Sequence, residues 1–150
     1  NKEYKYEDLN NELKNKLINI NDYLVFNDHN QKIYIVLCDI KFDKNILLIP
    51  AGKKITLTLN HNGKFPKVGM GHNFVLLKAD TNVSEFAEKA AMARKTDYIP
   101  EGDQTIAYTK LLGGGESDTI TFDAPKKGYY TFLCTFPGHW QLMKGKLIVK

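Results

Sequence analysis

Hydrophobic and polar residues alternate over much of the chain with the spacing of β-strands. Ile55, Leu57 and Leu59 alternate with threonines, which is the pattern of a strand with one buried face. Short apolar runs bounded by Gly, Pro, Asn and Asp predict further strands around it. Several short strands separated by turns predict an all-β sandwich or barrel. The expected strands cover residues 33–38, 46–49, 55–59, 74–77, 120–122, 129–134 and 147–149.

Two segments depart from this pattern and predict helices. Residues 83–94 are rich in Ala, Glu, Met and Lys, which predicts one helix inserted between strands. Near the N-terminus, apolar residues recur at spacings of four, four and three, which places them on one helical face. We therefore expect an amphipathic helix over about residues 6–19, which either packs on the domain surface or acts as a docking or tethering element. Its apolar positions are Leu9, Leu13, Leu17 and Ile20.

A chain of 150 residues is long enough for one domain with its own core. We expect a partly helical N-terminal extension, residues 1–31, followed by a β-domain, residues 32–150. No run of 18 apolar residues is present, so no membrane span is predicted. The charged residues are scattered along the chain and the net charge is only +4. This does not support nucleic-acid binding but permits attraction to an acidic partner. Because the sequence begins at Asn1 rather than Met, we expect any targeting signal to be missing from it.

Residues 134–143 carry three metal-ligating side chains between two predicted strands. Cys134, His139 and Met143 follow one another at intervals of five and four residues. His72, in the segment 70–73, supplies a second imidazole at the start of another strand. Thiolate and thioether are soft ligands, and two His with one Cys and a distant Met form the type 1 (blue) copper site. The pattern therefore predicts a copper site that transfers single electrons.

Several other interpretations remain open for these residue types. Zinc accepts Cys and His, although structural zinc sites recruit more thiolates, while calcium and magnesium need oxygen ligands. Cys134 and His139 also suit a nucleophilic pair, but no orienting acid is evident and Met143 is left unexplained. A copper chaperone or storage protein is the main alternative, yet such proteins favour exposed ligand pairs. Residues 113–115 lack the spacing of a phosphate-binding loop, which excludes nucleotide binding.

From about residue 32 to 150 the chain resembles the azurins, bacterial members of the cupredoxin family. Four residues separate Cys134 from His139 and three separate His139 from Met143, which is the azurin loop length. The resemblance implies a Greek-key β-sandwich with one copper ion at one end. It implies His72, Cys134 and His139 as equatorial ligands, with Met143 and the Gly71 carbonyl as weak axial ligands. The motifs that carry it span residues 70–73, 108–112, 121–123, 134–139 and 142–145.

The resemblance also implies roles for residues around the metal. Asn73 and the backbone near Phe136 would hydrogen-bond the Cys134 sulfur, which tunes the potential. His139 would be the exposed ligand through which electrons pass, and His61 a second histidine that does not ligate. An apolar surface around His139, the docking patch, would bring redox partners close. Its candidate residues are Phe65, Pro66, Met70, Met92, Phe136, Pro137, Trp140 and Leu142.

The chain departs from the azurin pattern at several positions. The usual N-terminal disulfide lacks its second cysteine, so we expect Cys38 to be a free buried thiol. Phe74 stands where many azurins have a buried tryptophan. Trp140 follows ligand His139 where azurins usually carry a small residue, and we expect it to contact the rim of the site. The first 31 residues have no counterpart in ordinary azurins.

The resemblance implies a periplasmic electron carrier that cycles between Cu(I) and Cu(II), not an enzyme. The expected partners are c-type cytochromes, a nitrite reductase or a peroxidase. Two further interpretations stay open, a cupredoxin module of a larger oxidase or reductase and an extension that follows a removed lipid anchor.

Overall fold

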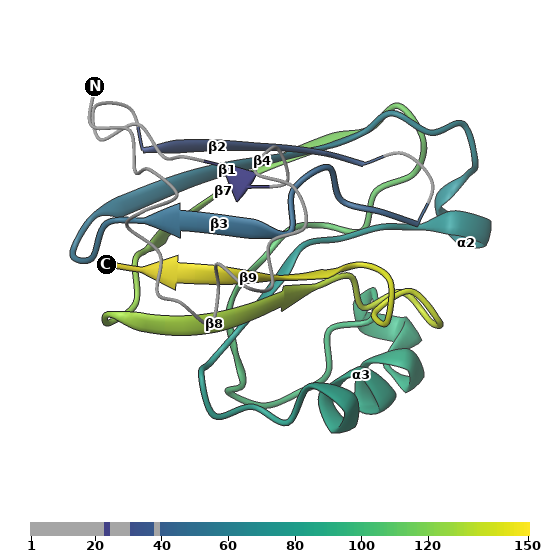
Figure 1. Ribbon diagram of the computed structural model, residues 1–150. Coiled ribbons are helices and arrows are strands. Elements are labelled where there is room, and N and C mark those ends of the chain that lie inside the picture. The colour runs from purple at the N-terminus through teal and green to yellow at the C-terminus, as the bar shows by residue number, and fades with distance from the viewer. Residues whose placement is uncertain (1–22, 25–30, 38–39) are drawn as a thin grey trace.

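Two β-sheets packed face to face form the fold, as the computed structural model of the chain shows (Figure 1). The small sheet has the order β2-β4-β7 and the large sheet the order β1-β3-β9-β8-β5-β6. The expected all-β sandwich is thereby confirmed. The structure describes residues 23–24, 31–37 and 40–150. The helix expected over about residues 6–19 and the Cys38 thiol lie outside the described residues.

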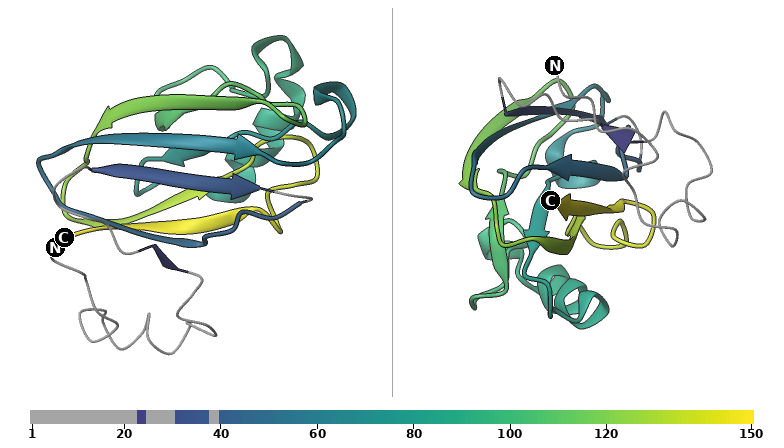
Figure 2. Two further views of the ribbon diagram at one scale, coloured as in Figure 1. Left: turned by 90° about the horizontal axis from the view of Figure 1, so that it is seen from above. Right: turned by 60° about the vertical axis from the view of Figure 1, so that its left-hand side comes forward.

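The small sheet follows the alternating sequence pattern closely. β2 (Lys32–Leu37) runs parallel to β4 (Lys54–His61), which pairs antiparallel with β7 (Ser117–Asp123). The three strands lie side by side in the left view of Figure 2. The apolar residues of β4 are fully buried, while Thr58 on the other face hydrogen-bonds the Thr119 hydroxyl at 2.8 Å. One face of this sheet is therefore core and the other is solvated.

The large sheet contains two strands that the hydrophobic pattern did not predict, β1 and β6. Strand β6 is an edge strand whose residues are only partly buried, so its sequence carries no strong alternation. β1 pairs in parallel with β3. The expected boundary between an N-terminal extension and the β-domain, at residues 31 and 32, stays a prediction. The strands are β1 (Tyr23–Leu24), β3 (Ile46–Ile49), β5 (Val75–Leu77), β6 (Thr105–Tyr108), β8 (Gly128–Leu133) and β9 (Lys144–Val149).

The inserted helix α3 (Val83–Met92) confirms the prediction, although it ends two residues early, and a short 3₁₀ helix, η3 (Arg94–Thr96), follows. Helix α3 covers the outer face of the large sheet, where Phe86 packs with Val75 and Leu77 of β5. A second helix, α2 (Lys67–Met70), is a single turn that was not predicted. Among the described residues, no helix combines the length and apolar character needed to cross a membrane.

The main core lies between the two sheets and is closed at one end by aromatic rings. Phe74 stacks on Phe132 with ring centroids 5.1 Å apart, and Phe42 meets Phe132 edge-on at 5.6 Å. All three rings belong to the same buried cluster as Cys134 and Met143. The predicted ligands therefore extend the hydrophobic core, at the end of the molecule where α2 and the β8–β9 loop lie (Figure 1).

Candidate metal centre

The structure brings three of the predicted ligands together in one buried cluster. The Cys134 Sγ lies 3.8 Å from the His72 Nδ1 and 3.8 Å from the His139 Nδ1. These three donor atoms all lie within 4.8 Å of one another. His72 and Cys134 are 0% exposed and His139 is 5% exposed, so the histidine expected to be exposed is itself buried, although it is the most exposed of the three.

A single loop carries Cys134, His139 and Met143, and hydrogen bonds join its two ends. Cys134 follows β8, Met143 precedes β9, and the Cys134 amide donates to the Met143 carbonyl at 3.0 Å. Within the loop, the Met143 amide donates to the His139 carbonyl at 2.8 Å. Gly138 has φ +82°, a left-handed conformation that glycine adopts without steric cost. The loop therefore holds the thiol and one imidazole on the same side of a tight turn.

His72 comes from a different part of the chain and is fixed by its backbone. Its amide donates to the Leu112 carbonyl at 3.0 Å, and the Leu112 amide donates back at 2.8 Å. The preceding Gly71 is crowded, because a Cβ there would lie 2.7 Å from the Lys67 carbonyl oxygen and 2.9 Å from Leu111 Cγ. A glycine is therefore required directly before His72.

Asn73 joins the two segments that carry the donors. Its side-chain amide donates to the Thr135 hydroxyl at 2.8 Å, and its Oδ1 accepts from the Thr135 amide at 2.8 Å. The backbone groups of Asn73 and Phe136 hydrogen-bond the Cys134 thiol. The contact between Asn73, the Phe136 backbone and the sulfur thus agrees with the expectation from the sequence.

The protonation states of the donors follow from burial. Burial, and then the charges of His139 and His61, lower the pKa of His72 from 6.5 to about 3. Burial likewise lowers the pKa of His139. Burial raises the pKa of the Cys134 thiol from 9.0 to about 11, although hydrogen bonds from Asn73 and Phe136 act in the opposite direction. Both imidazoles therefore keep free lone pairs at neutral pH, while the metal-free thiol keeps its proton.

His61 lies beside the donor cluster and is held in one tautomer. Its ring centroid is 4.8 Å from that of His72. The Gly63 amide donates to its Nδ1 at 3.0 Å, so its Nε2 carries the proton and lies 3.3 Å from the Met70 carbonyl. His61 and His72 both line a cavity of about 480 Å³. His61 offers no lone pair to the cluster, in agreement with its expected non-ligating role.

The donor set fits a single metal ion. With a metal–sulfur distance of about 2.3 Å and a metal–nitrogen distance of about 2.0 Å, separations of 3.8 Å correspond to angles of about 120°. One sulfur and two nitrogens within reach of one ion are the equatorial donor set of blue copper sites. Met143 is 0% exposed and packs in the same cluster as Cys134, which leaves its thioether inside the apolar surroundings of the site.

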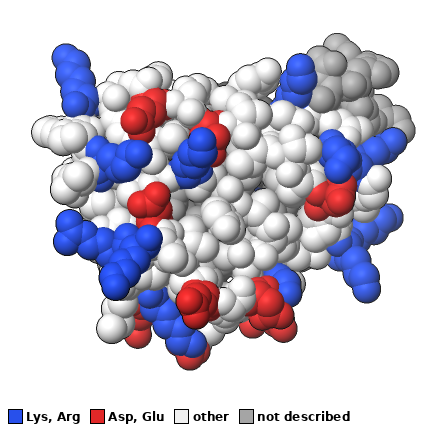
Figure 3. Space-filling model, turned by 180° about the vertical axis from the view of Figure 1, so that it is seen from behind, with Lys and Arg blue, Asp and Glu red and all other residues white. Residues whose placement is uncertain are grey.

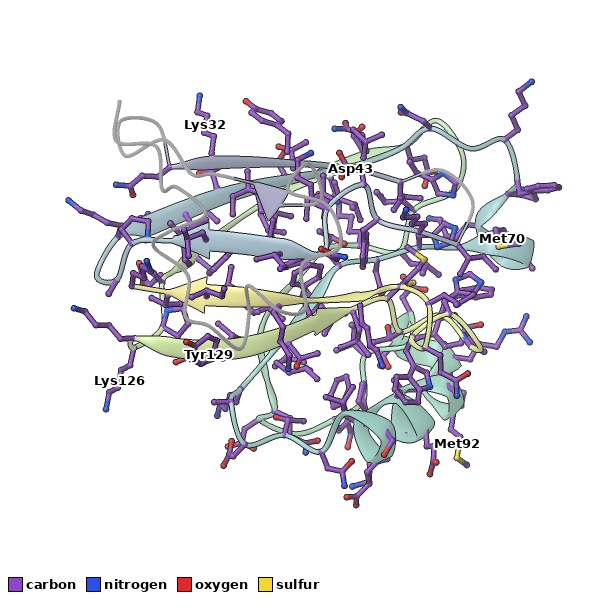
Figure 4. All side chains as sticks on the ribbon, viewed as in Figure 1. Lys32, Asp43, Met70, Met92, Lys126 and Tyr129 are labelled. Atoms are coloured by element: carbon purple, nitrogen blue, oxygen red, sulfur yellow. The ribbon has the colours of Figure 1, made fainter. Side chains whose placement is uncertain are left out.

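The candidate docking residues surround this end of the molecule. Phe65 is 62% exposed, Leu142 is 71% exposed and Met92 is 87% exposed. Pro66 and Pro137 are also exposed, while Met70, Phe136 and Trp140 are half-buried. Figure 4 shows Met70 and Met92 at the same end, with Lys126 at the other. Phe136 reaches the site directly, because its ring centroid is 4.7 Å from that of His139.

Trp140, which we expected to contact the rim of the site, lies on the side of the large sheet that carries α3. Its side chain packs against the cluster formed by α3 and the outer face of the large sheet. Lys144 Nζ lies 5.0 Å from the centroid of its ring. Sequence reasoning also did not find Thr135 and Leu112, which hold the ligand segments, or Tyr98, whose ring meets Phe136 at 5.2 Å. Only for Leu112 did the sequence contain a signal, because it belongs to the azurin-like motif at residues 108–112.

A β-sandwich with a buried His-Cys-His cluster at one end, closed by a Met-containing loop, defines the class of blue copper proteins. Residues 28–150 match the protein family described as copper-binding proteins of the plastocyanin/azurin family. Azurin from Alcaligenes faecalis is 41% identical over 108 residues, which cover 69% of this chain and 84% of that protein. Azurin from Bordetella pertussis is 46% identical over 114 residues, which cover 71% and 75% respectively.

Solved structures agree with these relatives. Reduced auracyanin from Roseiflexus castenholzii superimposes with a TM-score of 0.73 at 35% identity, over 81% of this chain and 98% of that one. The chain belongs to the plastocyanin/azurin family of copper-binding proteins. It is a type 1 copper electron-transfer protein that uses one copper ion.

Proposed function

We propose that His72, Cys134 and His139 are the three strong copper ligands, with Met143 and the Gly71 carbonyl as weak axial ligands. The observation that carries this assignment is the equal 3.8 Å separation of the Cys134 sulfur from the two histidine nitrogens. When bound, copper supplies a one-electron couple between Cu(I) and Cu(II). The protein supplies a buried, preformed ligand set, so little rearrangement accompanies the change of oxidation state.

Each residue around the donors has a part in this function. The hydrogen bonds from Asn73 and Phe136 stabilise the thiolate of Cys134. The reciprocal bonds between His72 and Leu112 fix the position of the first imidazole. The edge of His139 is the part of the donor set closest to solvent, so electrons pass through it. The docking patch around this edge lets a partner approach.

The same arrangement argues for a carrier and not an enzyme. Four side chains converge from one loop and one neighbouring segment, and all four are buried. A closed ligand set of this kind leaves no position for a substrate. We therefore propose that the chain shuttles electrons between other redox proteins, with a c-type cytochrome, a nitrite reductase or a peroxidase as candidate partners. We place this activity in the periplasm and assign it to residues 32–150.

The visible absorption spectrum after addition of Cu(II) tests the assignment. We expect an intense blue band that bleaches with ascorbate and returns on reoxidation. Cys134→Ser removes the band because the thiolate is lost, whereas Cu(II) added to a Ser117→Ala control gives the full band. A colourless wild-type protein that still binds metal would contradict the assignment of Cys134 and favour copper storage or zinc binding.

A further inference from the structure

Lysine and arginine side chains surround the docking patch. Some of them stand along the edge that faces left in Figure 3, which is the end that carries α2 in Figure 1, and others stand along the opposite edge. Along the chain, cations flank three of the exposed apolar segments of the patch. Lys64 and Lys67 flank residues 65–66, Arg94 and Lys95 follow Met92, and Lys144 follows Leu142.

Lys144 is the cation whose position the structure fixes most directly. Its Nζ lies 5.0 Å from the centroid of the Trp140 ring, within the range of a cation–π interaction. Trp140 is itself held, because it packs against the α3 cluster and is half-buried. It also directly follows His139, the donor nearest to solvent. Trp140 therefore keeps a positive charge beside the point where electrons leave.

Acidic side chains lie among the cations at this end (Figure 3). Glu116 pairs with Lys67 at 3.8 Å, and Asp97 is exposed next to Tyr98. Within the described part of the chain, Lys64, Lys95, Arg94 and Lys144 form no ion pair. These four cations therefore lie beside the docking patch without an ion-pair partner in the described residues, while exposed residues of the patch such as Phe65 and Leu142 are apolar.

We propose that this surface docks a redox protein whose exposed redox edge is ringed by carboxylates. The proposal rests on electron transfer through His139. The apolar centre allows the two redox edges to meet, and the cations steer an acidic partner into that orientation. Two copies of this chain are disfavoured face to face, because their cationic rims repel. An anionic membrane would meet the cations but offers no acceptor at the His139 edge.

Electron transfer to small charged oxidants measures the electrostatic field at the docking patch. In one reaction, the Cu(I) protein gives one electron to hexacyanoferrate(III), which becomes hexacyanoferrate(II) as the copper becomes Cu(II). In the other, cationic tris(phenanthroline)cobalt(III) takes the electron and becomes the cobalt(II) complex. Each second-order rate constant is measured by stopped flow over a range of ionic strength. We expect the first to fall with salt and the second to rise.

Charge reversal locates the effect. Lys144→Glu and Lys64→Glu should each slow the reaction with hexacyanoferrate(III) by about tenfold at low ionic strength and speed the reaction with the cobalt complex. Lys126→Glu changes the net charge equally at the far end of the molecule (Figure 4), so we expect less than about a twofold effect. Trp140→Leu should weaken the preference for the anion, and Trp140→Phe should retain most of it.

A binding measurement without electron transfer completes the test. Hexacyanochromate(III) should broaden the amide resonances of the reduced protein around residues 64–67, 94–95 and 140–144. Equal rates for all three charge reversals, or broadening at the Lys126 end, would overturn the proposal. So would sedimentation with phosphatidylglycerol vesicles that Lys144→Glu abolishes while the rates stay unchanged, since this favours a membrane. Every variant is first checked for the blue band, whose loss would refute the copper assignment and not the docking surface.

Discussion

Asn73 and Thr135 bind each other through two hydrogen bonds, each 2.8 Å long. Asn73 directly follows His72, and Thr135 directly follows Cys134. Both residues are buried, so water cannot replace either bond. The pair therefore locks together two ligand-bearing segments that are far apart in the sequence. The geometry of the donor cluster depends on this contact as well as on the loop that contains Cys134 and His139.

Asn73→Ala should destabilise the metal-free protein by about 1–3 kcal/mol, because it leaves the buried Thr135 amide without a partner. Urea unfolding measures the change. Asn73→Ala combined with Thr135→Ala should cost less than the sum of the two single changes, since both remove the hydrogen bond between the Asn73 amide and the Thr135 hydroxyl. Asn62→Ala, at an exposed asparagine, is the matched control and should change the stability by less than about 0.5 kcal/mol. Full additivity of the two changes would contradict the coupling.

How much of the site the sequence predicts depends on sequence separation. Cys134, His139 and Met143 lie within one loop between two strands, so their spacing alone indicates a shared site. Thr135 is 62 residues from Asn73, and no local pattern joins them. Strand β6 escaped prediction for a related reason, because an edge strand with partly exposed residues has no clear alternation.

The glycine run at residues 113–115 is another feature whose role depends on a distant contact. The sequence excludes a phosphate-binding loop there, and the structure shows why a glycine is needed. A Cβ at Gly114 would overlap the backbone of Gly63, the residue whose amide fixes the His61 ring. The position of Trp140 against α3 was also outside local reasoning, because the helix that receives it is far away in the sequence.

Copper(II) binding at pH 7 should release about one proton, because the thiolate is the ligand while the metal-free Cys134 is protonated. Burial raises the pKa of Cys134 to about 11, whereas it lowers the pKa of His72 to about 3 and also lowers that of His139. Titration calorimetry in two buffers of different ionisation enthalpy counts the proton. Release of two or more protons would mean that a histidine is charged in the free protein.

The metal-free protein should be most stable between about pH 6.5 and 9. An unfolded chain protonates His72 near pH 6.5, but the native pKa is about 3, so stability falls as the pH drops between these values. At the other end, an unfolded chain loses the Cys134 proton near pH 9, whereas the native pKa is about 11, so stability falls as the pH rises. Urea unfolding across this range measures both limbs.

His72→Gln separates the acid limb from other titrations. A glutamine cannot take up the proton, so the decline in stability below pH 6.5 should become shallower. Cys134→Ser should flatten the alkaline limb in the same way. If His72→Gln leaves the acid limb unchanged, other groups cause it and the assigned pKa of His72 is wrong.

Met143→Leu should keep the blue band and make the reduction potential more positive. Leucine fills a similar volume in the core, so the fold is retained at a cost below about 1.5 kcal/mol. The thiolate that gives the band stays in place, but the thioether that favours Cu(II) is lost. Cyclic voltammetry measures the potential. The more exposed Met92→Leu is the control and should leave it unchanged. An unchanged potential in Met143→Leu would remove Met143 from the ligand set.

Gly145→Ala should destabilise the protein although it adds only one methyl group. A Cβ at this position of β9 would overlap the Asn45 carbonyl oxygen and the Phe132 ring, and neither can move freely inside the sheet and core. Overpacking of this kind costs about 1–3 kcal/mol. Gly69→Ala in α2 is the matched control, since a Cβ there meets nothing within 4 Å and alanine favours a helix. Urea unfolding should therefore separate the two variants by more than about 1 kcal/mol. Equal stability would mean that β9 can shift at Gly145, and the β8–β9 pairing beneath the metal loop would then be looser than the structure indicates.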